Sequence, residues 1–268
     1  MTGGTSVGGG VAVDERSPAA FEIDELTAGY EQAIVVRDAS LAVPAGAVVA
    51  LVGPNGAGKT TLLKSASGLI TPRSGRVRLA GEDITSLTTH QRVEKGLCHV
   101  PEGSGVYPSL TVGENLRLQS MKSREAEGIE RAVAVFPVLG RRMNQLAGTL
   151  SGGERKMLAM AAVYIRDPKL IVVDEPSFGL APRIVEEIFT FLRGVAEKGA
   201  SLLIVDQYVN QVLQLADHVY VMRQGLLTYV GRAASVDADD LAEQYFGTGS
   251  GTIHEDADGH RSSGGVRA

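Results

Sequence analysis

The chain has 268 residues, of which 44% are hydrophobic and 21% charged, as in globular proteins and unlike disordered ones. Its formal net charge of -5 offers no general attraction for polyanions, so no nucleic-acid partner is expected. The single cysteine, Cys98, excludes an internal disulfide, and no Cys/His cluster has zinc spacing, which favours a reducing, cytosolic setting. No apolar run approaches the roughly 18 residues that span a bilayer, so another chain would have to hold this one at a membrane.

The two ends of the chain differ from its middle. Residues 1–20 and 248–268 are rich in Gly, Ser and charged residues, with little apolar surface to bury, so we expect tails there. Residues 21–247 alternate short apolar runs with helical patterns and show no solenoid or propeller repeat. One α/β domain with a side lobe accounts for this length.

Short apolar runs predict the strands of that domain. Three runs are continuously apolar, as strands buried on both faces of a mainly parallel sheet should be. They are residues 48–52, 170–173 and 202–205. Weaker runs predict edge β structure at residues 21–26, 77–80 and 219–222.

Helical spacing appears in two regions. Ile184, Val185, Ile188, Leu192 and Val195 recur at helical intervals with charged residues between them, so we expect a helix that connects two buried strands. The pattern of residues 88–165 is mostly helical. It predicts a separate helical lobe inserted into the α/β core.

A glycine-rich segment, G-P-N-G-A-G-K-T, directly follows the predicted strand at 48–52. It fits G-x-x-x-x-G-K-[ST] in the strand-to-helix context that this motif requires, so we predict a phosphate site rather than a plain glycine-rich turn. Backbone N–H groups and the positive end of a helix starting near Gly58 would bind phosphate oxygens. Lys59 would reach the β- and γ-phosphates, Thr60 would ligate Mg²⁺, and Thr61 would contact phosphate. The predicted nucleotide-binding residues here are Gly53, Pro54, Asn55, Gly56, Ala57, Gly58, Lys59, Thr60 and Thr61.

Two acids, Asp174 and Glu175, end the predicted strand at 170–173. In open α/β sheets the carboxyl ends of the strands line the ligand crevice. Asp174 would hold Mg²⁺ through its water shell, and Glu175 would orient and polarise the water that attacks the γ-phosphate. Taken alone, the pair reads equally well as a solvated strand end before the turn residue Pro176. The phosphate motif upstream favours the catalytic interpretation.

The sequence L-S-G-G-E at residues 150–154 opens a predicted helix through Met157 and Ala161. Its serine and glutamate form an S-x-x-E capping box. Capping leaves Gly152 and Gly153 unexplained, because two glycines weaken a first helical turn unless something must approach the backbone closely. The pentapeptide matches the signature of ABC ATPases, and residues 21–247 resemble that family. The resemblance implies a P-loop core with a mainly parallel sheet, an antiparallel β subdomain and the inserted helical lobe.

The resemblance also implies that the chain binds and hydrolyses ATP with Mg²⁺. Ser151, Gly152 and Gly153 of one chain would contact the γ-phosphate of ATP bound to a second ATPase subunit, so the working form would be a dimer. Tyr30 stands where the family stacks an aromatic ring on adenine, although by itself it reads as a core or surface tyrosine. Residues 177–180 occupy the position of the D-loop at the dimer interface.

Two positions depart from the commonest pattern of the family. Glu102 replaces a glutamine that approaches the metal and touches the transmembrane partner; glutamate keeps an oxygen donor but adds charge. Gln207 stands at the position of the switch histidine, where an amide can still bond the γ-phosphate but does not titrate near neutral pH. Glu175 is then the main water-orienting residue, with Gln207 beside it in the predicted catalytic set.

Wider stretches resemble the ATPase subunits of branched-chain amino-acid importers, at residues 74–75, 81–85, 100–103, 107–112 and 177–189. This implies a complex with a second ABC ATPase, two transmembrane permease subunits and, indirectly, an external solute-binding protein. The chain would lie at the cytoplasmic face of the cell membrane, with residues 103–110 in the groove that receives a permease helix.

Other functions stay open from the sequence. Urea or short-amide importers carry similar ATPases. A soluble ABC ATPase that remodels a protein assembly is a second alternative, which the single set of motifs disfavours because many such proteins carry two cassettes in one chain. A silent binding module conflicts with the intact set of Lys59, Asp174 and Glu175.

Overall fold

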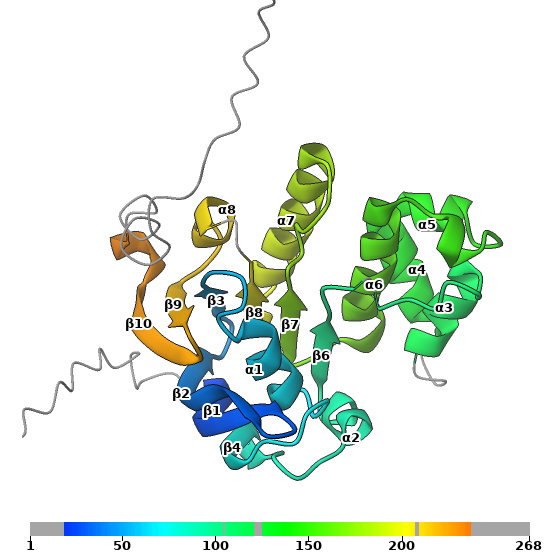
Figure 1. Ribbon diagram of the computed structural model, residues 1–268. Helices are drawn as coiled ribbons and strands as arrows, with labels where there is room; N and C mark the ends of the chain where they lie inside the picture. The colour runs from blue at the N-terminus through cyan, green and yellow to red at the C-terminus, as the bar shows by residue number, and fades with distance from the viewer. Residues whose placement is uncertain (1–18, 104, 121–124, 207–208, 237–268) are drawn as a thin grey trace, which may run out of the picture.

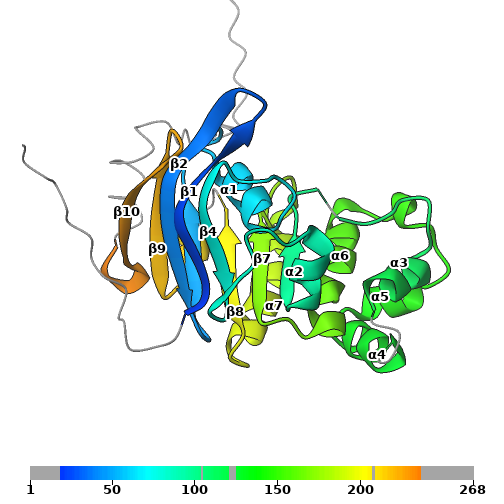
Figure 2. The ribbon, with the colours of Figure 1, turned by 90° about the horizontal axis from the view of Figure 1, so that it is seen from below.

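The computed structural model describes residues 19–103, 105–120, 125–206 and 209–236. Two β-sheets stack with a helix between them, and a group of helices lies at one end (Figures 1 and 2). Of the two predicted tails, the structure describes only Ala19 and Ala20, which begin the first strand rather than a tail. Among the described residues no helix has the length and apolar character needed to cross a bilayer.

The larger sheet has six strands in the order β10-β9-β3-β8-β7-β6. All neighbouring pairs are parallel except β10 with β9. The three predicted buried strands are confirmed as β3 (Val48–Val52), β7 (Leu170–Asp174) and β8 (Ser201–Val205), and every residue in them is buried. The other members are β6 (Leu97–Val100), β9 (His218–Arg223) and β10 (Leu226–Arg232).

The smaller sheet is antiparallel, in the order β2-β1-β4-β5. Its strands are β1 (Ala19–Tyr30), β2 (Ala33–Pro44), β4 (Ser74–Leu79) and β5 (Glu82–Asp83). The predicted strands at 21–26, 77–80 and 219–222 exist, but the prediction that they are edges is wrong. Each of β1, β4 and β9 pairs on both sides, because strands missed in the sequence (β2, β5 and β10) cover them.

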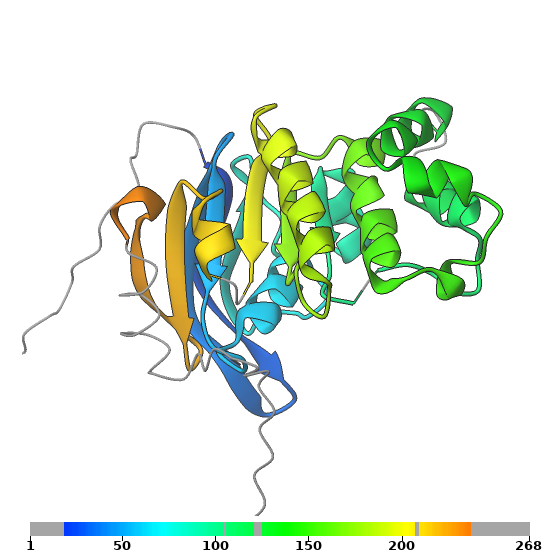
Figure 3. The ribbon, with the colours of Figure 1, turned by 90° about the horizontal axis from the view of Figure 1, so that it is seen from above.

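Helices cover both faces of the larger sheet. The helix α1 (Lys59–Ala66) lies between the two sheets, and α7 (Pro182–Ala196) connects β7 to β8 as predicted (Figure 3). The helix α8 (Val209–Leu213) leads into β9. The helical group consists of α3 (Val112–Gln119), α4 (Glu125–Val135), α5 (Pro137–Arg141) and α6 (Gly152–Arg166).

The predicted helical lobe, residues 88–165, begins with elements of other kinds. The short helix α2 (Thr89–Glu94) is followed by β6, which is the edge strand of the larger sheet. Its four residues are too short and its flanks too helical in pattern for periodicity to reveal a strand. The helical group itself therefore starts after β6 and ends with α6.

Alternate residues of the buried strands separate two apolar cores. Val48, Ala50 and Val52 pack in the core that contains α6 and α7, whereas Val49 and Leu51 pack against α1 and the antiparallel sheet. Burying an aliphatic side chain of this size contributes about 1.5–3 kcal/mol. A continuously apolar strand is therefore buried on both faces. The polar residues that follow these strands lie together at the carboxyl edge of the sheet.

Candidate active site

The glycine-rich segment after β3 forms a tight loop that ends at α1. A side chain at position 53 would come within 2.2 Å of the carbonyl oxygen of Met222, so only glycine fits there. Gly58 has a φ of 108° and stands at the N-cap of α1. That conformation favours glycine. A hydrogen bond joins the loop to the turn that follows β9: the Gly225 N–H donates to the carbonyl oxygen of Ala57.

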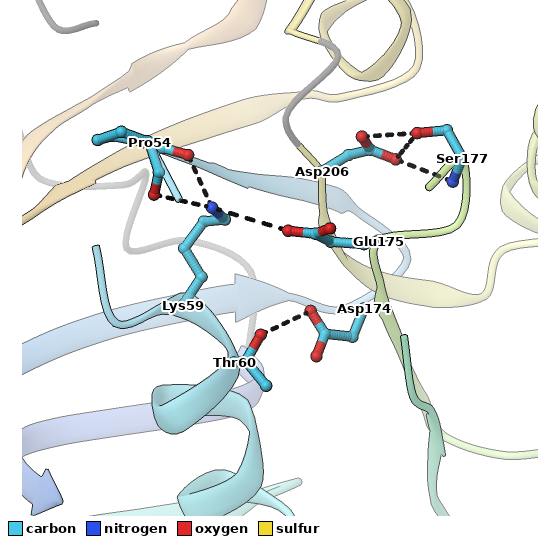
Figure 4. A network of polar contacts seen from close by, with 8 residues as sticks. Pro54, Lys59, Thr60, Asp174, Glu175, Ser177 and Asp206 are labelled. Carbon is cyan, nitrogen blue, oxygen red and sulfur yellow. Dashed lines mark hydrogen bonds and ion pairs between the residues drawn. The ribbon is translucent and has the colours of Figure 1, made fainter. Parts of the chain in front are cut away.

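Lys59 is buried, with 4% of its surface exposed. Its Nζ donates to the carbonyl oxygens of Gly53 at 2.7 Å and Pro54 at 3.2 Å, and lies 4.0 Å from Oε1 of Glu175 (Figure 4). Burial lowers the pKa of the Lys59 ammonium, and the Glu175 carboxylate opposes that shift. The Lys59 ammonium is therefore held between the glycine-rich loop and the Glu175 carboxylate.

Thr60 and Asp174 form the predicted metal side of the site. The Thr60 hydroxyl donates to Oδ1 of Asp174 at 3.4 Å, across the crevice from α1 to the end of β7 (Figure 4). Burial raises the pKa of Asp174, while the hydrogen bond from Thr60 and the charges of Lys156 and Lys59 oppose that shift. Among the described residues no group of three or more His, Cys, Asp or Glu could hold a metal ion. Two hard oxygen donors fit Mg²⁺, which takes its remaining ligands from water and substrate phosphates.

Glu175 lies next to the lysine and has 8% of its surface exposed. Burial raises the pKa of its carboxyl, the Lys59 charge lowers it, and the charges of Glu102, Asp174 and Asp206 raise it further. Its backbone has a φ of 43°, in the left-handed region that non-glycine residues rarely occupy. Such conformations persist where the surroundings enforce them and cluster at active sites.

Three other predicted site residues are placed less completely. Glu102 is exposed on the loop after β6, and its charge acts on Lys59, Asp174 and Glu175. Tyr30 ends β1 with 46% of its surface exposed, which leaves the ring available for stacking. Gln207 lies outside the described residues.

The signature residues stand at the start of α6. Ser151 is the N-cap, its hydroxyl accepts from the Glu154 amide, and the Glu154 carboxylate accepts from the Ser151 amide, which confirms the capping box. A side chain at position 153 would come within 2.7 Å of Cγ2 of Ile184 in α7. Packing inside the chain thus already requires one of the two glycines. Gly152 is exposed, and a side chain there would meet only ordinary contacts.

The structure adds two buried polar residues that sequence reasoning missed. Asp206, at the end of β8, accepts from the hydroxyl and the amide of Ser177, which links the segment after β7 to the end of β8 (Figure 4). Lys156 on α6 donates to carbonyl oxygens around Glu175. An acid that ends a buried strand was the available signal for Asp206. Lys156 directly follows Glu154 and Arg155, so the sequence presents it as part of a charged run and gives no local signal for its burial.

The site as a whole gathers charge at one edge of the sheet. β3, β8 and β7 are consecutive neighbours, so their carboxyl ends bring the glycine-rich loop, Asp206 and the Asp174–Glu175 pair together. The buried cations are Lys59 and Lys156, and the carboxylates that act on them are Glu102, Asp174, Glu175 and Asp206. The surplus of carboxylates suits a divalent cation, and the loop and helix start suit an anion. Together they fit a metal-bound polyphosphate.

Comparison with known proteins identifies the family. The model of the family described as ABC transporter matches residues 36–178, more than half of the chain. This range covers the glycine-rich loop, the signature and the two acids at the end of β7, Asp174 and Glu175.

Several curated relatives align over most of the chain. The probable branched-chain amino acid transport ATP-binding protein LivF of Archaeoglobus fulgidus is 38% identical over 213 residues, 78% of this chain and 90% of that protein. The high-affinity branched-chain amino acid transport ATP-binding protein BraG of Pseudomonas aeruginosa is 36% identical over 231 residues, 85% and 99% of the two chains. A lipopolysaccharide export system ATP-binding protein, LptB of Acidithiobacillus ferridurans, also matches, at 32% identity over 232 residues.

Solved structures agree on the architecture. A structure titled as the ATP binding subunit of an ABC transporter superposes with a TM-score of 0.72 at 27% identity, covering 86% of this chain and 95% of that one. The predicted fold class is thereby confirmed. This chain belongs to the ABC transporter ATP-binding family, whose members hydrolyse ATP.

Proposed function

We propose that this chain is the ATP-hydrolysing subunit that energises an ABC importer, with branched-chain amino acids as the solute. The observation that carries the proposal is the approach of the first turn of α1 to the two acids at the end of β7. Lys59 Nζ lies 4.0 Å from Glu175 Oε1, and Thr60 Oγ1 lies 3.4 Å from Asp174 Oδ1. The names of LivF and BraG, which align over 78% and 85% of the chain, support the solute class.

ATP would bind with its phosphates in the loop of residues 53–58. Lys59 would exchange the Gly53 and Pro54 carbonyls for β- and γ-phosphate oxygens, since a phosphate is the stronger partner for a buried ammonium. The exposed ring of Tyr30 would stack on adenine. Thr60, Asp174 and Glu102 would hold Mg²⁺, which would supply positive charge to neutralise the phosphates.

Hydrolysis would proceed by in-line attack of water on the γ-phosphorus. Glu175 would orient that water and accept its proton while the bond from phosphorus to the leaving oxygen breaks, giving ADP and phosphate. The raised pKa of Glu175 brings it closer to the operating pH, which suits a group that takes and returns a proton. Gln207 would donate its amide to the γ-phosphate as the substitute for the more usual histidine.

A second ATPase subunit would complete the site. The N-terminus of α6, with Ser151, Gly152 and Gly153, offers backbone N–H groups and a positive dipole end to the γ-phosphate bound by the partner chain. Two permease subunits would carry the dimer at the cytoplasmic face of the membrane, with the solute-binding protein outside. The ATPase domain spans residues 19–247 in this proposal, since β1 begins at Ala19, with tails on either side.

Reconstitution tests the solute assignment. The chain would be expressed with the permease subunits encoded beside it, purified from membranes and placed in proteoliposomes with ATP and the cognate binding protein. Uptake of labelled leucine, absent with Glu175→Gln, is the expected result. Uptake of urea without leucine would favour the short-amide alternative. Extraction of lipopolysaccharide would place the chain with LptB-type exporters, and failure to co-purify with any permease would favour a soluble remodelling ATPase.

A further inference from the structure

Lys156 is a charged side chain inside the apolar face of α6, with only 4% of its surface exposed. Burial lowers its pKa to about 8, against the opposing charges of Asp174 and its neighbours. A buried cation destabilises a fold unless it is fully partnered. Its Nζ donates to three backbone carbonyl oxygens, those of Pro101 at 3.0 Å, Asp174 at 3.2 Å and Glu175 at 3.4 Å.

Two of these carbonyls belong to the two peptide groups on either side of the Glu175 α-carbon. Holding both groups fixes the two backbone dihedral angles of Glu175. Glu175 needs such a restraint because its φ is 43°, a conformation that costs roughly 1–3 kcal/mol in a non-glycine residue.

Pro176, which follows Glu175, limits the other ways in which the Glu175 backbone can be held. Pro176 has no N–H, so the peptide group between Glu175 and Pro176 can be held only through its carbonyl oxygen. On the amino side, the Glu175 N–H donates to the carbonyl of Val205 at 2.7 Å. On the carboxyl side, the Glu175 carbonyl accepts from Phe178 at 3.4 Å and from Lys156. The lysine is thus the one side chain among the described residues recorded as donating to both peptide groups.

We propose that Lys156 is a positioning residue for ATP hydrolysis: its ammonium enforces the left-handed backbone of Glu175 and so aims that carboxylate at the attacking water. The proposal rests on the water-orienting role of Glu175 given above. The third partner, the carbonyl of Pro101, extends the same restraint to the loop that carries Glu102. Since Lys156 lies in the second turn of α6, five residues after the Ser151 N-cap, it also ties the signature helix to the catalytic strand of its own chain.

A purely structural role makes a different prediction. If Lys156 only stabilised the fold, its replacement would lower the unfolding temperature and reduce every activity with it. If Lys156 positions Glu175, its replacement lowers kcat and leaves the nucleotide affinity in place, because no hydrogen bond recorded for Lys156 among the described residues reaches the phosphate loop. A positioning role also requires that the effect of Lys156 disappear when Glu175 no longer accepts a proton.

The test uses the full-length chain and the variant Lys156→Met, which keeps the length of the stem and removes the donor. We expect kcat to fall roughly 10- to 100-fold, as for a small misplacement of a catalytic group, with the affinity for Mg·ADP within about threefold of the parent. Leu158→Ala, which removes a fully buried side chain on the same helix, is the control; it should lower the unfolding temperature but keep kcat. Lys156→Gln, which keeps a shorter donor, serves if the methionine variant does not fold, with an intermediate kcat expected.

Single-turnover hydrolysis in the Glu175→Gln background gives the decisive comparison. Adding Lys156→Met there should change the rate less than about twofold. Parental kcat in Lys156→Met, or an undiminished loss in the Glu175→Gln background, would overturn the proposal. Parental hydrolysis by Glu175→Gln itself would overturn the role of Glu175, a separate result that removes the basis of the positioning argument.

Discussion

Lys59 is a buried ammonium that the fold holds among carbonyls and one carboxylate before any phosphate is present. Its carbonyl partners, Gly53 and Pro54, belong to the loop that would receive ATP. The burial that lowers its pKa also removes competing water, so a phosphate that enters meets a cation with little hydration left to lose. At the scale of single residues, the site is therefore preorganised for an anion.

Replacing that cation should weaken nucleotide binding more than any other single change in the loop. Lys59→Ala is expected to lose roughly 10- to 100-fold in ATP affinity, since hydrogen bonds to charged groups contribute about 1.5–3 kcal/mol. Isothermal calorimetry with Mg·ATP measures it, and Lys64→Ala, on the same helix and outside the loop, is the control. Equal affinity in Lys59→Ala and the parent would refute the phosphate site.

His99, in β6, should make the stability of the fold sensitive to acid. Burial lowers its pKa to about 4, with the charges of Lys156 and Lys64 adding to the effect, and its Nε2 is buried without a hydrogen-bond partner. Between pH 6.5 and 4 the unfolded chain then binds a proton that the folded chain excludes, so this residue lowers stability as the pH falls through that window. Other buried groups titrate there as well, so only a comparison of variants isolates its share.

The variant His99→Gln removes the titration and should flatten that part of the pH dependence. Denaturant unfolding of the parent and the variant at pH 7 and pH 4.5 gives four free energies of unfolding. The parent should lose more stability than the variant between the two pH values, by a margin on the order of 1 kcal/mol or more. An equal loss in both proteins would show that His99 takes up a proton as readily in the folded state.

At the scale of elements, the start of α6 would serve two purposes in the proposed dimer. Gly153 leaves room for Ile184, so packing against α7 already explains it, whereas the exposed Gly152 has no such role inside the chain. The two glycines thus separate an intramolecular function from an intermolecular one. Only a change at Gly152 tests the contact with a partner's phosphate without disturbing the core.

Gly152→Asp should leave ATP binding to the single chain intact and weaken ATP-dependent dimerisation, because a carboxylate would face the γ-phosphate of the partner. Gly152→Asn has the same shape without the charge and is the matched control. Dimer affinity, measured by analytical ultracentrifugation with Mg·ATP, should be lower for the aspartate variant than for the asparagine variant. If the two are equal, the start of α6 does not meet an anion.

The elements also show how far sequence patterns reach. The strands at 48–52, 170–173 and 202–205 were predictable because both faces are buried, so every position is apolar. β2 escaped because its buried and exposed positions follow no single period, β10 because none of its residues is fully buried, and β6 because four residues carry no period. The cradle and the two acids follow from local motifs, whereas Lys156 acts on carbonyls 18 and 19 residues away along the chain, which no local pattern reveals.

At the scale of the whole molecule, the two parts of the proposed shared site lie in different regions of the chain. The phosphate loop precedes α1 and the two acids lie at the end of β7, whereas the signature stands at the start of α6 in the helical group (Figure 1). Among the described residues no recorded hydrogen bond or ion pair joins Ser151, Gly152 or Gly153 to the loop of residues 53–58. This division is what a composite site requires, in which each chain completes the pocket of the other.

In the proposed cycle, ATP closes two chains around a shared site, and Glu175 then orients the water that attacks the γ-phosphate. Glu175→Gln should bind ATP normally, since the amide occupies the same space, yet slow hydrolysis roughly 100-fold or more because it cannot accept a proton. ATP-loaded dimers should therefore accumulate, as measured by light scattering after size-exclusion chromatography of the full-length variant with Mg·ATP and its partner subunit. We expect a stable dimer with ATP and a monomer with ADP. A monomer under both conditions would show that ATP does not close the pair, and hydrolysis at the parental rate would show that Glu175 does not place the water.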